Sequence, residues 1–112
     1  MSLGTVVLNP ETNSYAGGLA LLGRRQPLPI AIVPNDEKKR ENQPDYRIWS
    51  GPSELGGAWV REGRESKRPY VSVRIFHPQI GDQPIYATLG KAAGQDDEDV
   101  FAIIPNLSLI HI

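Results

Sequence analysis

The sequence contains no cysteine, which excludes disulfide bonds and zinc sites built on thiolates. It also lacks a net charge of any size, because 12 Lys and Arg stand against 13 Asp and Glu in 112 residues. Without an overall basic field, a polyanion would have to be held by a local patch of basic side chains. No apolar run approaches the ~20 residues of a membrane helix, and no signal peptide is visible. We therefore expect a cytoplasmic protein without membrane contact.

Helical patterns are missing as well. No window of about 11 residues or more repeats its apolar positions every 3.6 residues, and 11 Gly and 10 Pro punctuate the chain with frequent turns. Short β-like segments lie between these turns, at 4–8, 14–22, 28–34, 46–50, 57–62, 69–76, 84–89 and 100–104. We predict a single all-β domain over residues 4–104, with seven or eight short, mostly antiparallel strands in a curled sheet or small barrel. Residues 105–112 stay outside it, as a last strand or a tail.

Two segments carry more specific expectations. Residues 28–34 are apolar on both faces, which predicts the most buried strand. Gly17 and Gly18 interrupt the segment 14–22, and a glycine pair inside a strand is typical of a bulge or a sharp bend. The charged residues of 35–45 predict a solvated loop.

Motifs for catalysis and metal binding are weak. His77 precedes a proline at a strand end and has no partner at an informative spacing, so we interpret it as a turn residue. The acidic run 96–99 lacks the alternating ligands and central glycine of a calcium loop. No glycine pattern matches a phosphate-binding loop. We therefore predict no enzyme activity, no catalytic residue, no metal and no cofactor.

One constellation of residues does suggest binding. Three successive predicted strands each place aromatic and arginine side chains on one face, since alternate residues of a strand point the same way. The candidate binding residues are Arg47, Trp49, Trp59, Arg61, Tyr70 and Arg74. If the strands form an antiparallel meander, these side chains build a platform on which single-stranded nucleic acid stacks its bases. The alternative is that the rings belong to the core and the arginines reach out to its rim. The sequence leaves open whether Trp49 and Trp59 are core or surface.

Four short motifs in order resemble the small bacterial proteins of the domain of unknown function 736 family. The motifs are PDYR at 44–47, AW at 58–59, YVSVR at 70–74 and PIYA at 84–87. The opening residues also resemble the first hairpin of that family, so the resemblance covers roughly 4–104. The chain departs from the family where relatives carry Leu-Asp-Asp-Pro and this sequence has Ile-Phe-His-Pro at 75–78.

The resemblance implies no established activity. It does imply an origin on bacterial plasmids or integrating elements, and hence an accessory role in DNA handling, action against the host or regulation. Together with the residues above, it leads us to expect a non-enzymatic accessory binding module for single-stranded nucleic acid. The alternative is a module that binds another protein, or a second copy of itself, through strand edges or the aromatic face.

Overall fold

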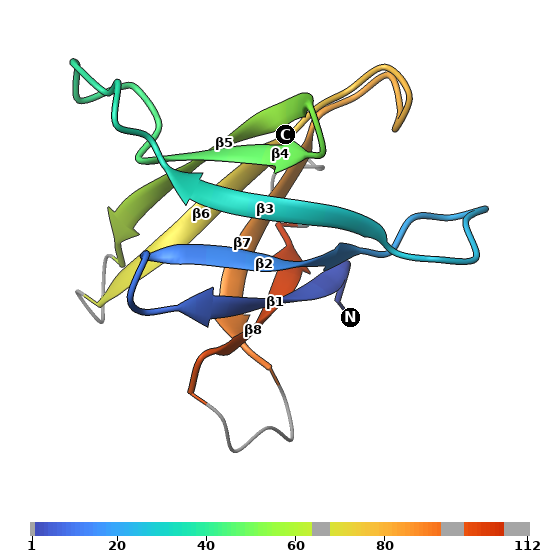
Figure 1. Ribbon diagram of the computed structural model, residues 1–112, viewed down its shortest axis with the longest axis horizontal. Helices are drawn as coiled ribbons and strands as arrows, with labels where there is room; N and C mark the ends of the chain where they lie inside the picture. Colours follow the sequence, from blue (N-terminus) through green and yellow to red (C-terminus); the bar gives the residue numbers. More distant parts are fainter. Residues whose placement is uncertain (1, 64–67, 93–97, 107–112) are drawn as a thin grey trace.

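The computed structural model describes residues 2–63, 68–92 and 98–106, and every regular element in this part of the chain is a β-strand (Figure 1). The eight strands are β1 Gly4–Asn9, β2 Ser14–Leu19, β3 Leu28–Pro34, β4 Tyr46–Ser50, β5 Ser53–Glu62, β6 Pro69–Ile75, β7 Ile85–Lys91 and β8 Val100–Pro105. Each predicted segment coincides with one of them. The largest difference is at β5, which begins four residues early because the β4–β5 turn consists only of Gly51 and Pro52. The described residues contain no helix able to span a bilayer.

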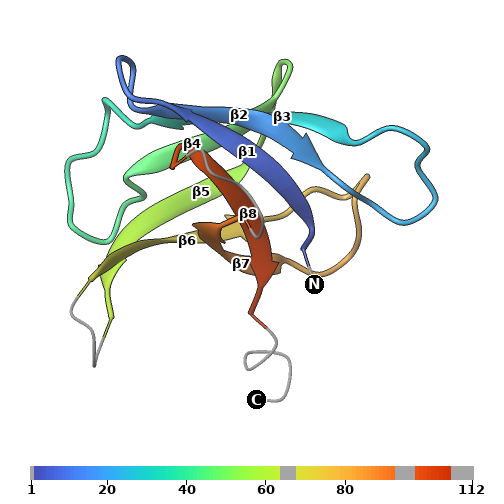
Figure 2. The ribbon, with the colours of Figure 1, turned by 90° about the horizontal axis from the view of Figure 1, so that it is seen from below.

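Each strand pairs antiparallel with the next along the chain, and β1 also pairs with β8, so that the sheet closes into a barrel. Figure 2 shows β1 and β8 lying side by side at this closure. The all-β prediction is thus confirmed. Of the two predicted arrangements, a curled sheet or a small barrel, the structure has the barrel. Beyond residue 104, Pro105 completes β8 and the Asn106 main-chain N–H donates to the Tyr86 carbonyl at 2.9 Å. The remainder of the predicted tail, 107–112, lies outside the described residues.

Alternate residues of every strand point inward and fill the barrel with apolar side chains. The buried core consists of Val6, Tyr15, Leu19, Ile30, Ile32, Tyr46, Ile48, Leu55, Ala58, Val73, Ile75, Ala87, Leu89 and Ile103. The prediction that residues 28–34 form the most buried strand was wrong, since only Ile30 and Ile32 of β3 are buried. A closed barrel gives every strand one interior face, so the apolar residues on the outer face of β3 keep contact with solvent.

The glycine pair of β2 produces no bulge, because the pairing of β2 runs without a break on both sides. Its role is to let strands approach closely: a Cβ on Gly17 would lie 2.0 Å from the Thr5 carbonyl oxygen. The register shift of the sheet lies instead between Ile48 and Trp49, where β5 contributes Leu55 as an extra residue.

Candidate nucleic-acid interface

All six candidate binding residues lie on the outer surface of the barrel. Their neighbours along the strands, Tyr46 and Ile48 in β4, Ala58 in β5, and Val73 and Ile75 in β6, are buried inside it. Trp49 and Trp59 are partly exposed, and Arg61, Tyr70 and Arg74 are exposed. Neither tryptophan belongs to the core. The structure therefore answers the question that the sequence left open.

Strand pairing brings most of these residues together over β5, β6 and β7. Trp59 stands opposite Ser72, and Arg61 stands opposite Tyr70. Arg74 lies between Gly57 on one side and Tyr86 on the other. Residues directly opposite on one face of a sheet have Cβ atoms about 5 Å apart. We call this surface, consisting of Trp59, Arg61, Tyr70, Arg74 and Tyr86, the outer aromatic–arginine face.

Sequence reasoning missed Tyr86, although it is 41% exposed and is the direct neighbour of Arg74. The signal was present in the alternation of 84–89, where Ala87 and Leu89 occupy the buried positions and Tyr86 the opposite ones. Extending the meander by one more strand would have found it. The face therefore carries three partly or fully exposed rings on three neighbouring strands.

The two arginines of this face lie beyond ion-pair distance of the described carboxylates, although the charge of Arg61 contributes to lowering the pKa of Asp45. Within the part of the chain that the structure describes, neither Arg61 nor Arg74 forms an ion pair. The Arg61 guanidinium lies 6.0 Å from the centre of the Trp59 ring, within the range of a cation–π contact. No residue of the described part of the chain therefore occupies either guanidinium through an ion pair.

Arg47 is in the opposite situation. Its Nε donates to Oε2 of Glu54 at 2.6 Å and its Nη2 donates to Oε1 at 3.0 Å, while Glu37 approaches to 4.0 Å. The pKa of Glu54 is lowered by the hydrogen bond from Arg47, which in turn raises the pKa of the guanidinium. The Arg47 guanidinium also lies 5.0 Å from the Trp49 ring. Its charge is already neutralised, so Arg47 and Trp49 form a self-contained group.

The segment that precedes β4 separates this group from the outer aromatic–arginine face. Gly57 faces outward between Arg47 and Arg74, and a Cβ placed on it would lie 2.8 Å from Cβ of Pro44. Next to it, the Trp59 indole Nε1–H donates to the Asn42 carbonyl at 3.1 Å. Pro44 and Asn42 therefore lie over the outer side of the sheet between the two groups. The six candidate residues do not form the single continuous platform that the sequence predicted.

Asp45 fastens this covering segment to the barrel. Its Oδ2 accepts the Val60 main-chain N–H at 2.8 Å, and its Oδ1 accepts from Nζ of Lys38 at 2.5 Å. The hydrogen bond from Lys38, followed by the one from Val60, lowers the pKa of Asp45. Most charged residues of 35–45 are exposed as predicted, but Lys38 and Asp45 are only 30% exposed, and the end of the loop is an anchored part of the sheet surface.

An apolar recess adjoins the outer face at one end of the barrel. It has a volume of about 350 Å³ and is lined by Tyr15, Tyr46, Val60, Pro69, Tyr70, Val71, Leu89, Gly90, Lys91 and Phe101. The Tyr15 ring packs edge-on against Tyr46 and Phe101, with centroids 5.9 and 5.6 Å apart. Burial, and secondarily Tyr46, raises the pKa of Tyr15, so its hydroxyl stays protonated. Tyr70 belongs both to the outer face and to this recess.

Comparison with known proteins identifies the family of the chain but no activity. The family described as "Protein of unknown function (DUF736)" matches residues 3–106, which is nearly all of the described part. No curated protein and no solved structure matches the chain.

Proposed function

The chain belongs to the DUF736 family of proteins of unknown function, and we propose that it is a non-enzymatic binding module for single-stranded nucleic acid. The observation that carries the proposal is the outer aromatic–arginine face, where partly or fully exposed rings alternate over β5, β6 and β7 with two arginines that form no ion pair with a described residue. Bases stack on aromatic rings in a sequence-tolerant way, and arginines hold the phosphates between them. We place this activity in the bacterial cytoplasm, as an accessory of a mobile element.

The geometry favours single strands over duplexes. A duplex keeps its bases stacked on one another, so the rings of the outer face would gain nothing from it. A duplex is instead held through many phosphates at once, whereas this face has two positive side chains, Arg61 and Arg74. The near-neutral net charge of −1 is compatible with a ligand that is bound mainly by stacking.

A protein partner is the second candidate, and it is favoured by a specific observation. Apolar side chains at the border of the outer face are exposed: Ile104 on β8 at 40%, and Val60 at the mouth of the apolar recess at 48%. Ile104 stands opposite Thr88 on the outer side of β8, so the apolar surface continues past β7. Because β1 pairs with β8, such a partner would meet a face of the barrel and not a free strand edge.

The experiment is a titration of the protein with an oligothymidine of about 12 nucleotides. Tryptophan fluorescence emission is the signal, and the titration is repeated at several salt concentrations. We expect quenching, with an affinity that falls as salt rises. Arg74→Gln should remove one phosphate contact and lower the salt slope by about 0.7. Arg47→Gln is the matched control, because that arginine is already paired with Glu54, and its slope should stay unchanged.

A second variant separates stacking from charge. Tyr86→Ala removes a ring that is 41% exposed and contributes little to the core, and we expect it to weaken binding by about 1–3 kcal/mol at every salt concentration. Absence of quenching at low salt would eliminate the nucleic-acid function. The protein-partner candidate would then be tested by sedimentation of the wild type against Ile104→Ser.

A further inference from the structure

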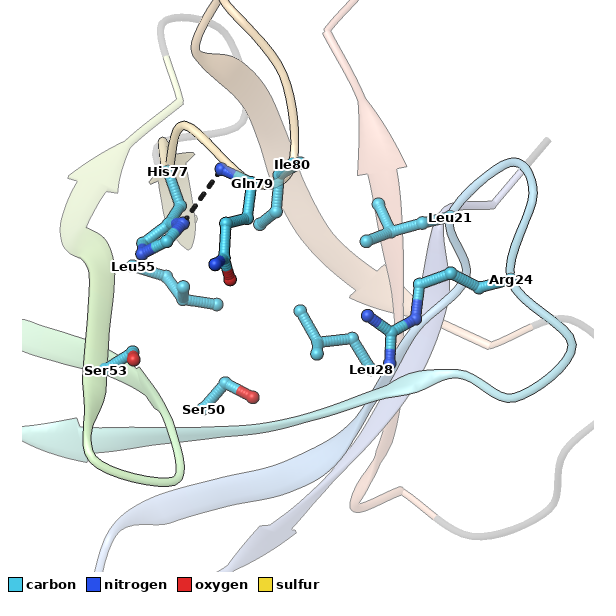
Figure 3. Close-up of a pocket in the computed structure, with 9 residues that line it drawn as sticks. All are labelled: Leu21, Arg24, Leu28, Ser50, Ser53, Leu55, His77, Gln79 and Ile80. Carbon is cyan, nitrogen blue, oxygen red and sulfur yellow. Dashed lines mark hydrogen bonds between the residues drawn. The ribbon is translucent and has the colours of Figure 1, made fainter.

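We propose that a second pocket, at the end of the barrel that carries the β2–β3, β4–β5 and β6–β7 turns, binds a small organic anion with a short alkyl chain. The pocket lies opposite the aromatic recess, where the turns β2–β3, β4–β5 and β6–β7 come together (Figure 3). Its volume is about 200 Å³. It shares no lining residue with the outer aromatic–arginine face, and the inference is independent of nucleic-acid binding.

Every polar side chain that lines this pocket can donate a hydrogen bond. They are Arg24 from the β2–β3 connection, Ser50 and Ser53 from the ends of β4 and β5, and His77 and Gln79 from the β6–β7 connection. Figure 3 shows the Arg24 guanidinium and the Gln79 amide both directed toward the middle of the pocket. No carboxylate is among the described residues that line it. A site whose one charged described residue is an arginine, and whose neutral polar side chains can all donate, favours an anion.

Arg24 is the residue that gives the pocket its charge. It forms no ion pair with any residue that the structure describes, and its main-chain N–H is held at the turn by the Leu21 carbonyl at 3.3 Å. A guanidinium binds a carboxylate or phosphate through two parallel hydrogen bonds. The side chain is exposed in the free protein, so an anion would find it accessible.

His77 adds a donor whose orientation is fixed by the turn. Its Nδ1 accepts the main-chain N–H of Gln79 at 3.1 Å, so the proton of the neutral ring is on Nε2. The imidazole can then donate from Nε2 but cannot act as a free base at Nδ1. This explains the histidine as a turn residue and, in addition, as a part of the rim of the pocket (Figure 3).

The floor of the pocket is apolar. Leu21, Leu28, Leu55 and Ile80 line it, and Leu55 is the bulge residue of β5, 4% exposed, that belongs to the core. An ion such as chloride would use the donors but leave this floor wet. A carboxylate or phosphate monoester with a short alkyl chain satisfies both parts, because its head meets Arg24 while its chain covers the leucines.

The test is a methyl-detected NMR titration of the full chain with sodium hexanoate, hexyl phosphate and 1-hexanol, which share an alkyl chain and differ in the head group. We expect both anions to shift the methyl signals of Leu28 and Leu55, with 1-hexanol at least about tenfold weaker. Arg24→Gln should weaken hexanoate binding by roughly tenfold or more. Arg25→Gln, the neighbouring exposed arginine that does not line the pocket, should bind as the wild type does.

A further variant tests the rim. His77→Asn retains an acceptor for the Gln79 N–H, as in an Asx turn, but removes the Nε2 donor, so the turn should survive while hexanoate binding weakens. Three results would overturn the proposal: no shift at Leu28 and Leu55, equal binding of 1-hexanol and hexanoate, or wild-type affinity in Arg24→Gln. Shifts confined to Leu89, in the recess at the other end, would also overturn it.

Discussion

The indole of Trp59 is held at its nitrogen by the main-chain carbonyl of Asn42, 17 residues earlier in the chain. This bond leaves the rest of the ring partly exposed while its orientation is fixed. A ring that is held in place before a ligand arrives loses little side-chain entropy on binding. The loop 35–45 therefore orients one ring of the outer aromatic–arginine face.

Trp59→Phe should keep a flat ring on the face but remove the hydrogen bond to Asn42. We expect a loss of about 0.5–1.5 kcal/mol in the free energy of unfolding and faster amide exchange in residues 42–45. Urea denaturation and hydrogen exchange measure the two effects. Trp49→Phe is the matched control, because the Trp49 indole N–H has no hydrogen-bond partner among the described residues. Equal exchange rates at 42–45 in both variants would contradict the anchoring role.

Asp45 should make the free energy of unfolding depend on pH, with a loss of stability in acid. Its pKa is lowered in the folded state, first by Lys38 and then by the Val60 N–H. The carboxylate therefore stabilises the fold at pH values above 3.8, the ordinary pKa of the group. This contribution is lost as the pH falls through the lowered pKa of the folded state. Asp45→Asn should be less stable than wild type at about pH 7, and the difference should shrink in acid. Urea denaturation across this range measures it, with the exposed Asp82→Asn as control.

Ile32→Ala should open a cavity in the middle of the barrel. Ile32 has no exposed surface, so we expect a loss of about 2–5 kcal/mol. Val33→Ala, one residue further on the outer side of the same strand, should cost clearly less because Val33 is partly exposed. Chemical denaturation of both variants compares the two faces. Similar losses at the two positions would mean that β3 is covered on both sides.

Gly17→Ala should be poorly tolerated. The added Cβ would meet the Thr5 carbonyl oxygen at 2.0 Å and the Val6 Cα at 2.7 Å, both of which belong to the backbone of β1. The two strands must move apart, so we expect a loss of at least about 1–3 kcal/mol. Gly81→Ala adds the same methyl group where no atom lies within 4 Å and should be close to neutral. Thermal unfolding of the pair provides the comparison.

The sequence predicts the strands well because turn residues separate them so regularly. Pairing with the next strand along the chain and alternation of inward and outward residues then follow from local rules, as at Val73 and Arg74. The early start of β5 was missed because Ser53 and Glu54 are polar and resemble a loop. The error at β3 arose because apolar residues on both faces are typical of a covered sheet, whereas this barrel leaves Pro29 exposed and Val33 partly exposed.

The sequence showed which candidate residues share a face of their strand, but not whether these faces join into one continuous surface. Alternation puts Arg47 and Trp49 on one face of their strand and Trp59 and Arg61 on one face of the next, but it left open whether the tryptophans lie inside or outside, and the structure places them outside. No local pattern shows that Pro44 packs on Gly57, or that Glu54 occupies Arg47, because these contacts depend on how a loop folds back over the sheet. The pocket at Arg24 was invisible for the same reason, since three separate turns build it.

The pairing of β1 with β8 joins the two ends of the domain, for example Val7 to Val100. The other strand pairs connect neighbours in the chain and can form from short loops, whereas this pair requires closure of nearly the whole chain and is entropically the most expensive to begin. We therefore expect the β1–β8 pair to form late in folding and to separate first when the protein is destabilised. A chain shortened by β8 would expose two unpaired strands, β1 and β7, which are the edges from which intermolecular aggregation starts.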